Sequence, residues 1–210
     1  ALGGSAFAQS LNKIGQNAPT VADTEKFIRA FNTVQKLIEK DLILAGHDIA
    51  SGGFITTVLE MCFSNKKGGM KVDLSGFDEE DIIKILFSEN PGIVIQCADN
   101  EDVKKSLQEN DVEFISLGNA VSYRKLRIVN GAEEIDFDID SLRDLWFKTS
   151  YLLDRKQSGE ELALQRYKNY KDFALEYDFG DFSGKTADYG IDPGRRKPTG
   201  IKAAIIREKG

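Results

Sequence analysis

The sequence predicts an α+β fold, in which helices pack on a layered, mixed β-sheet. Short apolar runs of strand length alternate along the chain with segments whose apolar residues recur at helical spacing. Glycine or proline separates many of these segments. Alternating strands and helices are buried most economically as a sheet covered by helices. A chain of 210 residues is long enough for one sizeable core with an appended linker.

In the N-terminal part, helices are expected at residues 5–14 and from a cap at Asp23 or Thr24 onward. The second helix would bury one apolar stripe, made of Phe27, Ala30, Phe31, Val34, Leu37 and Ile38. A strand at 42–48 and a helix at 54–65 complete this part of the chain.

The middle of the chain continues the alternation with a strand at 68–74. Asp78 is expected to cap the next helix, with Phe77 packed against Ile82. The later elements are expected as a strand at 91–98, a helix at 100–110 and strands at 112–118 and 123–129. A run of carboxylates follows, made of Glu133, Glu134, Asp136, Asp138 and Asp140. This run could hold a cation, but the pattern favours a solvated hairpin and helix start.

The character of the sequence changes near Asp140, and we divide the chain there. Residues 1–140 are expected to form the main domain, residues 141–200 a helical and then extended linker, and residues 201–210 the start of another domain. The helical part carries an apolar stripe as far as Gln157 and is broken at Ser158 and Gly159. Its extended part has Gly, Asp and Pro without either period, which is typical of a linker.

Composition narrows the classes of partner. Apolar residues make up 41% and charged residues 30%, a globular balance. The net charge of -6 and the pI near 5.0 disfavour nucleic acid, because phosphate neutralisation needs clustered Lys and Arg. No apolar run approaches the ~20 residues that span a bilayer, so we expect no membrane partner. Cys62 and Cys97 have no disulfide or metal-site spacing and are expected as core residues in a reducing cytoplasm.

The stretch HDIASGGF, residues 47–54, carries the strongest chemical signal. Asp48 would end a strand, and Gly52 and Gly53 would open a helix. Backbone amides at a helix N-terminus attract phosphate, and glycine lets phosphate approach the backbone. A neighbouring carboxylate can bind the Mg²⁺ that accompanies a nucleotide. The residues alone nevertheless favour a tight strand–helix turn capped by Asp48, because short glycine motifs often lack a ligand.

Other candidate sites are weaker. His47 is the only histidine, and no Ser–His–Asp or Cys–His set can be assembled around it. The structural interpretation, a hydrogen-bonded histidine at a strand end, is therefore favoured over a catalytic one. No catalytic residue is assigned to this chain.

Five segments in order resemble one family: LGGSAFAQ, AGHDIASGGFITTVLEMCF, LFSENPGIVIQ, LRDLWFKTSYLLDRKQ and GIKAAIIREKG. They are similar to the large single-chain phosphoribosylformylglycinamidine synthases of purine biosynthesis. The resemblance implies the second AIR-synthetase-type C-terminal domain and the linker that enters a glutaminase domain. It also implies that the nucleophilic cysteine of the glutaminase lies beyond Gly210. The partners would be the nucleotide-binding half and the glutaminase domain of the same polypeptide.

The activity implied by this resemblance is ATP- and glutamine-dependent amidation of formylglycinamide ribonucleotide. In this family, the HD-x-S-D-GG motif of the second half belongs to an auxiliary site that holds ADP and Mg²⁺. The resemblance makes Asp48 the metal ligand and places Ala50, Ser51, Gly52 and Gly53 at the nucleotide. Here Ala50 replaces the motif's serine and Ser51 replaces its aspartate, so a hydroxyl contact from position 50 is lost.

Two alternatives to this function remain. The first is a scaffold that binds no nucleotide because of Ala50. The second is another ATP-dependent enzyme of the same superfamily, such as selenophosphate synthetase or thiamine-monophosphate kinase. The segment LRDLWFKTSYLLDRKQ argues against the second alternative, because those relatives lack such an extension.

Overall fold

The computed structural model describes residues 1–98, 101–169, 178–192 and 194. Contacts between residues divide the chain into two units, Ala1–Lys171 and Asp172–Gly210. The predicted start of a further domain at 201–210 lies outside the described residues, as do parts of the predicted extended linker.

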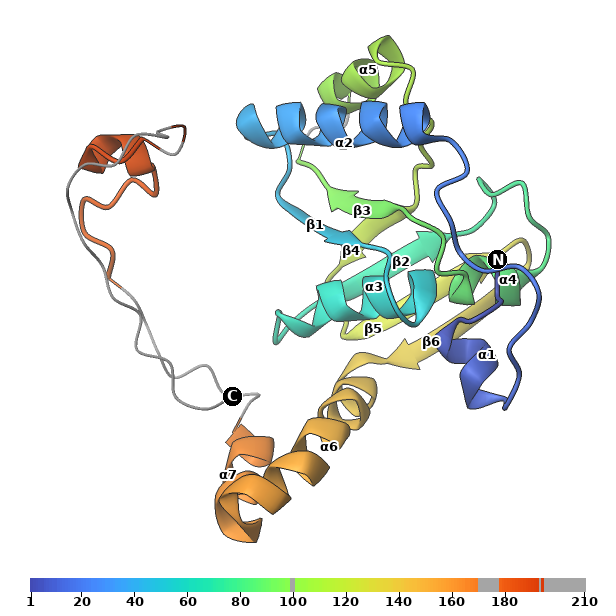
Figure 1. The fold of residues 1–210 in the computed structure, drawn as a ribbon, viewed down its shortest axis with the longest axis vertical. Coiled ribbons are helices and arrows are strands. Elements are labelled where there is room, and N and C mark those ends of the chain that lie inside the picture. Colours follow the sequence, from blue (N-terminus) through green and yellow to red (C-terminus); the bar gives the residue numbers. More distant parts are fainter. Residues whose placement is uncertain (99–100, 170–177, 193, 195–210) are drawn as a thin grey trace. The chain divides into compact units, whose positions relative to one another are not determined.

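A four-stranded mixed sheet forms the centre of the first unit (Figure 1). Its strands are β2 (Gly69–Asp73), β4 (Gly118–Val121), β5 (Lys125–Asn130) and β6 (Glu133–Asp138), in the order β4-β2-β5-β6. The central pair, β2 and β5, is parallel, whereas the outer pairs are antiparallel. This topology confirms the expected mixed sheet, and β5–β6 is the hairpin expected for the carboxylate run.

Helices α3 (Gly53–Phe63) and α4 (Ile82–Phe87) bury the apolar side of this sheet. The fully buried side chains of Leu126 and Ile128 on β5 lie in one core cluster with Val58 of α3. These two β5 residues share a face, as the alternating pattern predicts. The core therefore fixes α3, and with it the turn that contains the glycine pair.

A second, two-stranded sheet lies beside α3 and leads into the same turn. It pairs β1 (Ala45–Asp48) with β3 (Ile93–Gln96) in antiparallel fashion, with His47 opposite Val94. Helices α2 (Thr24–Glu39) and α5 (Glu101–Glu109) pack together above this sheet in Figure 1. A small core of Leu37, Val103 and Leu107 holds these helices together.

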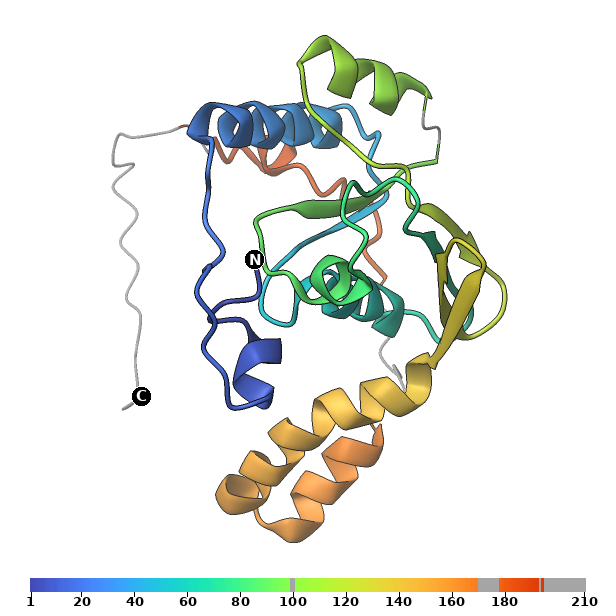
Figure 2. The same ribbon diagram turned by 90° about the vertical axis from the view of Figure 1, so that its right-hand side faces the viewer.

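The remaining helices of the first unit are α1 (Ala6–Ser10), α6 (Ile139–Ser158) and α7 (Glu160–Asn169). Figures 1 and 2 show α6 and α7 side by side as a helical hairpin. Gly159, with a φ of 84°, makes the break between them, as predicted. None of the helices in the described part of the chain is long and apolar enough to cross a bilayer.

The second unit contains a short 3-10 helix, η1 (Thr186–Tyr189). The rings of Phe179 and Phe182 stack with their centroids 6.0 Å apart, and Tyr189 lies 5.2 Å from Phe182. The predicted extended linker therefore includes a local aromatic cluster.

Four predictions about elements are wrong. Helix α1 ends at Ser10, so the helix expected at 5–14 is only half as long. Helix α4 begins after Asp81, whose carboxylate accepts hydrogen bonds from the amides of Ile83 and Lys84, so Asp78 is not its cap. Residues 112–117 form no strand, and β4 begins only at Gly118, where the edge of β2 offers a partner. The apolar stripe of α2 is only partly buried, because Phe31 is 56% exposed.

Candidate functional site

The turn from β1 to α3 requires its two glycines for reasons of backbone geometry. Gly52 and Gly53 have φ angles of 92° and 76°, in the left-handed region that favours glycine. A Cβ on Gly53 would lie 2.6 Å from the carbonyl carbon of Phe87, at the end of α4. The pair thus allows α3 to start against the backbone of α4. This close approach accounts for Gly53 without any ligand.

Asp48 lies at the end of β1 with its side chain 77% exposed. It does not cap α3, because the N-cap position is occupied by Gly52 and no side chain caps this helix. The interpretation of Asp48 as a helix cap is therefore wrong. Its backbone carbonyl accepts a hydrogen bond from the Thr57 hydroxyl at 3.1 Å, which fixes the strand end to α3. The carboxylate itself remains at the surface, where it can bind a cation.

The predicted nucleotide-contacting residues differ in exposure. Ala50 and Ser51 are exposed, Gly52 is half-buried and Gly53 is buried. The amide of Gly53 donates to the carbonyl of Ala50 at 3.0 Å. Of these four residues, Ala50 and Ser51 are therefore the ones most accessible to a ligand.

Glu89 is a residue of this site that the sequence reasoning missed. Its Oε1 accepts hydrogen bonds from the amides of Gly52 and Ala6, each at 2.8 Å. These amides lie at the starts of α3 and α1, where a negative charge is favourable. The carboxylate of Glu89 thus occupies the position that a phosphate would take at Gly52. No local sequence signal connects Glu89 with a turn that lies 37 residues earlier.

His47 connects the strand end with α3. Its Nε2 lies 2.9 Å from Oε2 of Glu60, and its Nδ1 lies 2.9 Å from the carbonyl oxygen of Asp48. The other carboxylate oxygen of Glu60 accepts from Nε1 of Trp146 on α6 at 2.7 Å. This geometry confirms that His47 is a hydrogen-bonded residue at a strand end.

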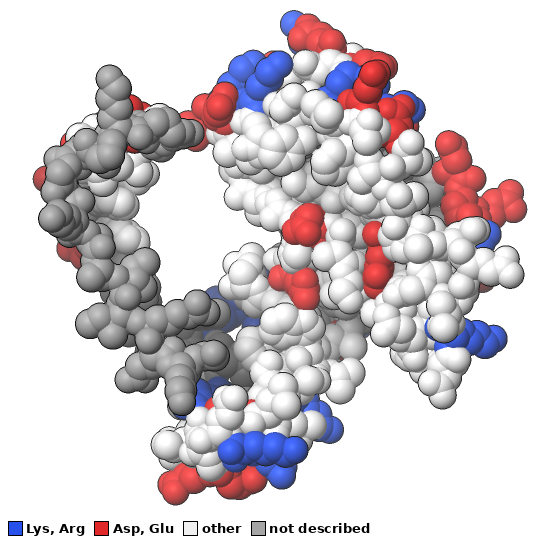
Figure 3. Space-filling model, in the orientation of Figure 1, with Lys and Arg blue, Asp and Glu red and all other residues white. Residues whose placement is uncertain are grey.

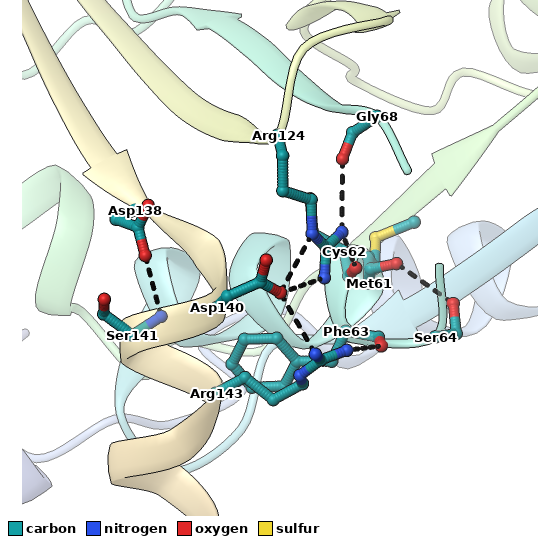
Figure 4. A network of polar contacts seen from close by, with 10 residues as sticks. All are labelled: Met61, Cys62, Phe63, Ser64, Gly68, Arg124, Asp138, Asp140, Ser141 and Arg143. Atoms are coloured by element: carbon teal, nitrogen blue, oxygen red, sulfur yellow. Dashed lines mark hydrogen bonds and ion pairs between the residues drawn. The ribbon is translucent and has the colours of Figure 1, made fainter. Parts of the chain in front are cut away.

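A network of arginines holds the first turn of α6 at the end of α3 (Figure 4). Arg124 donates to the carbonyls of Cys62 and Gly68, at 2.8 and 3.1 Å. Asp140 lies 3.1 Å from both Arg124 and Arg143. Because cations are favourable at a helix C-terminus, the two guanidinium groups stabilise the end of α3 and orient α6.

The donor set around Asp48 fits Mg²⁺ as a partial site. A surface carboxylate at a strand end is a hard oxygen ligand of the kind Mg²⁺ prefers. Among the described residues, no group of three or more His, Cys, Asp and Glu is arranged to hold a metal ion. Asp48 would therefore supply one ligand of such an ion. On the face shown in Figure 3, acidic side chains occur near the centre of the drawn surface.

Both cysteines are free: Cys62 is buried, as expected of a core residue, whereas Cys97 is only partly buried. Burial raises the pKa of the Cys62 thiol above its ordinary value, although the charge of Arg124 acts in the opposite direction. A thiol with a raised pKa carries little of the thiolate that acts as a nucleophile. Cys62 is thus a core residue.

Comparisons with known proteins agree on one family. The sequence profile of the AIR synthase related protein, C-terminal domain, matches residues 1–129. A human protein named phosphoribosylformylglycinamidine synthase is 31% identical over 220 aligned residues, and the Saccharomyces cerevisiae protein of that name is 30% identical. A probable chloroplastic or mitochondrial synthase from Arabidopsis thaliana is also 30% identical.

These alignments cover 100% of this chain but only 15 to 16% of the relatives. A solved structure of PurLQS from Thermotoga maritima has a TM-score of 0.51 and 15% identity. The structural alignment covers 57% of this chain and 22% of the solved chain. This similarity supports the fold. Because the profile matches more than half of the residues, the chain belongs to the family of the AIR synthase related protein, C-terminal domain.

Proposed function

We propose that the chain is part of a phosphoribosylformylglycinamidine synthase. This enzyme would be the ATP- and glutamine-dependent ligase that converts formylglycinamide ribonucleotide to formylglycinamidine ribonucleotide in purine biosynthesis. The observation that carries the proposal is the alignment of the whole chain, at 31% identity, with the human protein of that name. The same proposal makes residues 1–140 the AIR-synthetase-related domain, residues 141–200 a linker and residues 201–210 the start of the glutaminase.

Within that enzyme, we assign the turn after β1 to an auxiliary site for Mg²⁺ and ADP. Asp48 would bind the metal, because its carboxylate is exposed at the strand end. Ala50 and Ser51 would border the nucleotide, with Gly52 and Gly53 shaping the turn. When bound, Mg²⁺ supplies positive charge that neutralises the phosphates of ADP. The chain's own contribution is to hold the carboxylate in place and to stabilise the domain.

The Asp48→Asn variant of the complete polypeptide tests this assignment. Asn keeps the shape and one oxygen ligand but removes the charge, so the variant should lose co-purifying ADP. Its melting temperature should also fall, because a ligand that binds only the folded state stabilises it. Nucleotide released by denaturation is measured by chromatography, together with the rate of synthesis per folded molecule, which should change much less. A variant that keeps its ADP but loses the rate would contradict the assignment.

A nucleotide-free scaffold is the second candidate, and Glu89 favours it. Its carboxylate already accepts the hydrogen bond of the Gly52 amide, and Ala50 offers no hydroxyl. Wild-type polypeptide that carries no nucleotide, and whose melting temperature does not change with added Mg²⁺ and ADP, would support the scaffold.

A further inference from the structure

We propose that Glu60 is a positioning residue for the Asp48 site and that it couples this site to α6 through Trp146. This inference rests on the proposed metal–nucleotide site and goes beyond it. Four residues connect the site with α6: Asp48 and His47 on β1, Glu60 on α3 and Trp146 on α6. The short contact between the first two is made by the backbone carbonyl of Asp48.

The first step concerns what keeps Asp48 available. Nδ1 of His47 lies 3.4 Å from Oδ1 of Asp48, which is longer than an ordinary N–H···O hydrogen bond. The opposite nitrogen, Nε2, lies only 2.9 Å from Oε2 of Glu60. Nδ1 itself lies 2.9 Å from the backbone carbonyl oxygen of Asp48, so Glu60 and this carbonyl together hold the imidazole beside the Asp48 carboxylate. Without Glu60, only the contact with the Asp48 carbonyl would hold the ring, and the imidazole could turn toward the Asp48 carboxylate and compete with a metal ion for its oxygens.

The second step concerns what fixes Glu60. Its side chain is only 23% exposed, and its two oxygens have different partners. Oε2 faces His47, while Oε1 accepts the indole N–H of Trp146 at 2.7 Å. A carboxylate held at both oxygens cannot rotate without breaking one of these contacts. The indole of Trp146 thus sets the orientation of the group that restrains His47.

The third step concerns α6, which presents Trp146. Asp140 and Arg143 anchor the first turns of this helix against the carbonyl end of α3. Trp146 then packs on Phe63, with ring centroids 5.9 Å apart. Between α3 and α6 lies a cavity of about 320 Å³ whose lining includes Glu60 and Trp146.

Binding of Mg²⁺ and ADP to the complete polypeptide tests the inference. After removal of bound nucleotide, calorimetry compares wild type with Glu60→Gln and Trp146→Phe, and the binding lost in Asp48→Asn defines this site. Direct partners of metal ligands typically contribute about 10- to 100-fold to affinity. Glu60 contacts His47 and not Asp48 itself, so Glu60→Gln should bind severalfold more weakly. Trp146→Phe, which changes no charge, should weaken binding by a smaller factor. This neutral change separates positioning from simple loss of a negative charge.

A matched control is Glu39→Gln, which removes a carboxylate at the end of α2 and should bind like wild type. Fluorescence gives a second readout, because Trp146 is the only tryptophan of the 210 residues. The difference in emission between wild type and Trp146→Phe should change on addition of Mg²⁺ and ADP. In the Glu60→Gln background, the emission of Trp146, again taken as the difference from a Trp146→Phe variant of the same background, should not change on this addition. Melting curves establish that each variant is folded.

The outcomes distinguish the inference from the function on which it rests. If Asp48→Asn binds weakly but Glu60→Gln and Trp146→Phe bind like wild type, the inference is wrong and the proposed site stands. If wild type shows no binding that depends on Asp48, both are wrong. If Glu60→Gln does not fold, the affinity and emission of Trp146→Phe decide the question alone.

Discussion

At the N-terminus of α3, the chain supplies its own anion. Glu89 accepts the amide hydrogen bonds of Gly52 and Ala6, so a phosphate at Gly52 would have to displace or repel this carboxylate. In Glu89→Gln the side-chain oxygen can still accept these bonds, but the charge is gone. We expect the variant to bind Mg²⁺ and ADP severalfold more tightly, because the competing negative charge is gone. Its free energy of unfolding should fall by about 0.3–1 kcal/mol, because a negative charge at a helix N-terminus is stabilising. Calorimetry and denaturant titration measure the two effects.

The control for this prediction is Glu80→Gln, which removes a carboxylate from the exposed segment just before α4. Glu80→Gln should change neither the affinity for Mg²⁺ and ADP nor the free energy of unfolding. Unchanged nucleotide affinity in Glu89→Gln, in a protein whose wild type does bind ADP, would mean that Glu89 and the nucleotide use different positions.

Gly53 permits a second residue-scale test. In Gly53→Ala the new methyl group meets the Phe87 backbone at 2.6 Å, and the φ of 76° is unfavourable for alanine. Gly131→Ala is a matched control, since Gly131 also has positive φ, at 62°, but has open space around its Cβ position. The control should cost about 1–2 kcal/mol of unfolding free energy, and Gly53→Ala clearly more. Equal losses in urea titrations would show that contact with α4 does not explain Gly53.

At the scale of elements, the hairpin of β5 and β6 is held by charge pairs across its strands. Arg127 and Asp136 lie opposite each other, with Nε and Oδ1 2.7 Å apart. The hydrogen bonds from Arg127 lower the pKa of Asp136 from 3.8 to about 2, and Lys125 adds to this shift. A carboxylate whose pKa is lower in the folded state stabilises the fold above its unfolded pKa. This contribution is lost as the pH falls from about 4 through 2.

Asp136→Asn should therefore melt at a lower temperature than wild type at neutral pH. The difference should shrink between pH 4 and pH 2, where wild type loses the charge as well. Thermal melts at a series of pH values measure this, with Glu133→Gln at the start of β6 as the control. A difference that stays constant to pH 2 would mean that Asp136 acts through packing and not through its charge.

The sequence predicts an element well when the pattern that specifies it is local, and poorly when contacts with distant parts of the chain set its position. Helix α3 and strand β5 are predicted well, because their apolar periodicity is local and their buried faces belong to the core. The cap of α4 was misplaced because Asp78 and Asp81 are equally good caps by residue type. Strand β4 was misplaced because GNAV has no alternating pattern, and its position is set by the edge of β2.

At the scale of the whole molecule, the candidate site joins parts of the chain that are far apart in sequence. The turn from β1 to α3 around Asp48 could be predicted, since its signal is contiguous. Glu89, Glu60 and Trp146 could not, because they reach the site only through the packing of α3, α4 and α6. The chain spans 15 to 16% of the length of its curated relatives.

The last prediction concerns the activity of the 210-residue chain by itself. Hydrolysis of glutamine by a thiol needs an accessible thiolate, but Cys62 is buried and its pKa is raised. The other thiol, Cys97, is partly buried against the core of Leu37, Val103 and Leu107. Both ring nitrogens of His47, the only histidine, already face oxygens of Asp48 and Glu60. The purified chain should therefore release no ammonia from glutamine and form no formylglycinamidine ribonucleotide with ATP. The complete polypeptide, assayed in parallel, should do both. Ammonia release that the chain sustains, and that Cys62→Ser abolishes, would show that this thiol is a nucleophile despite its burial.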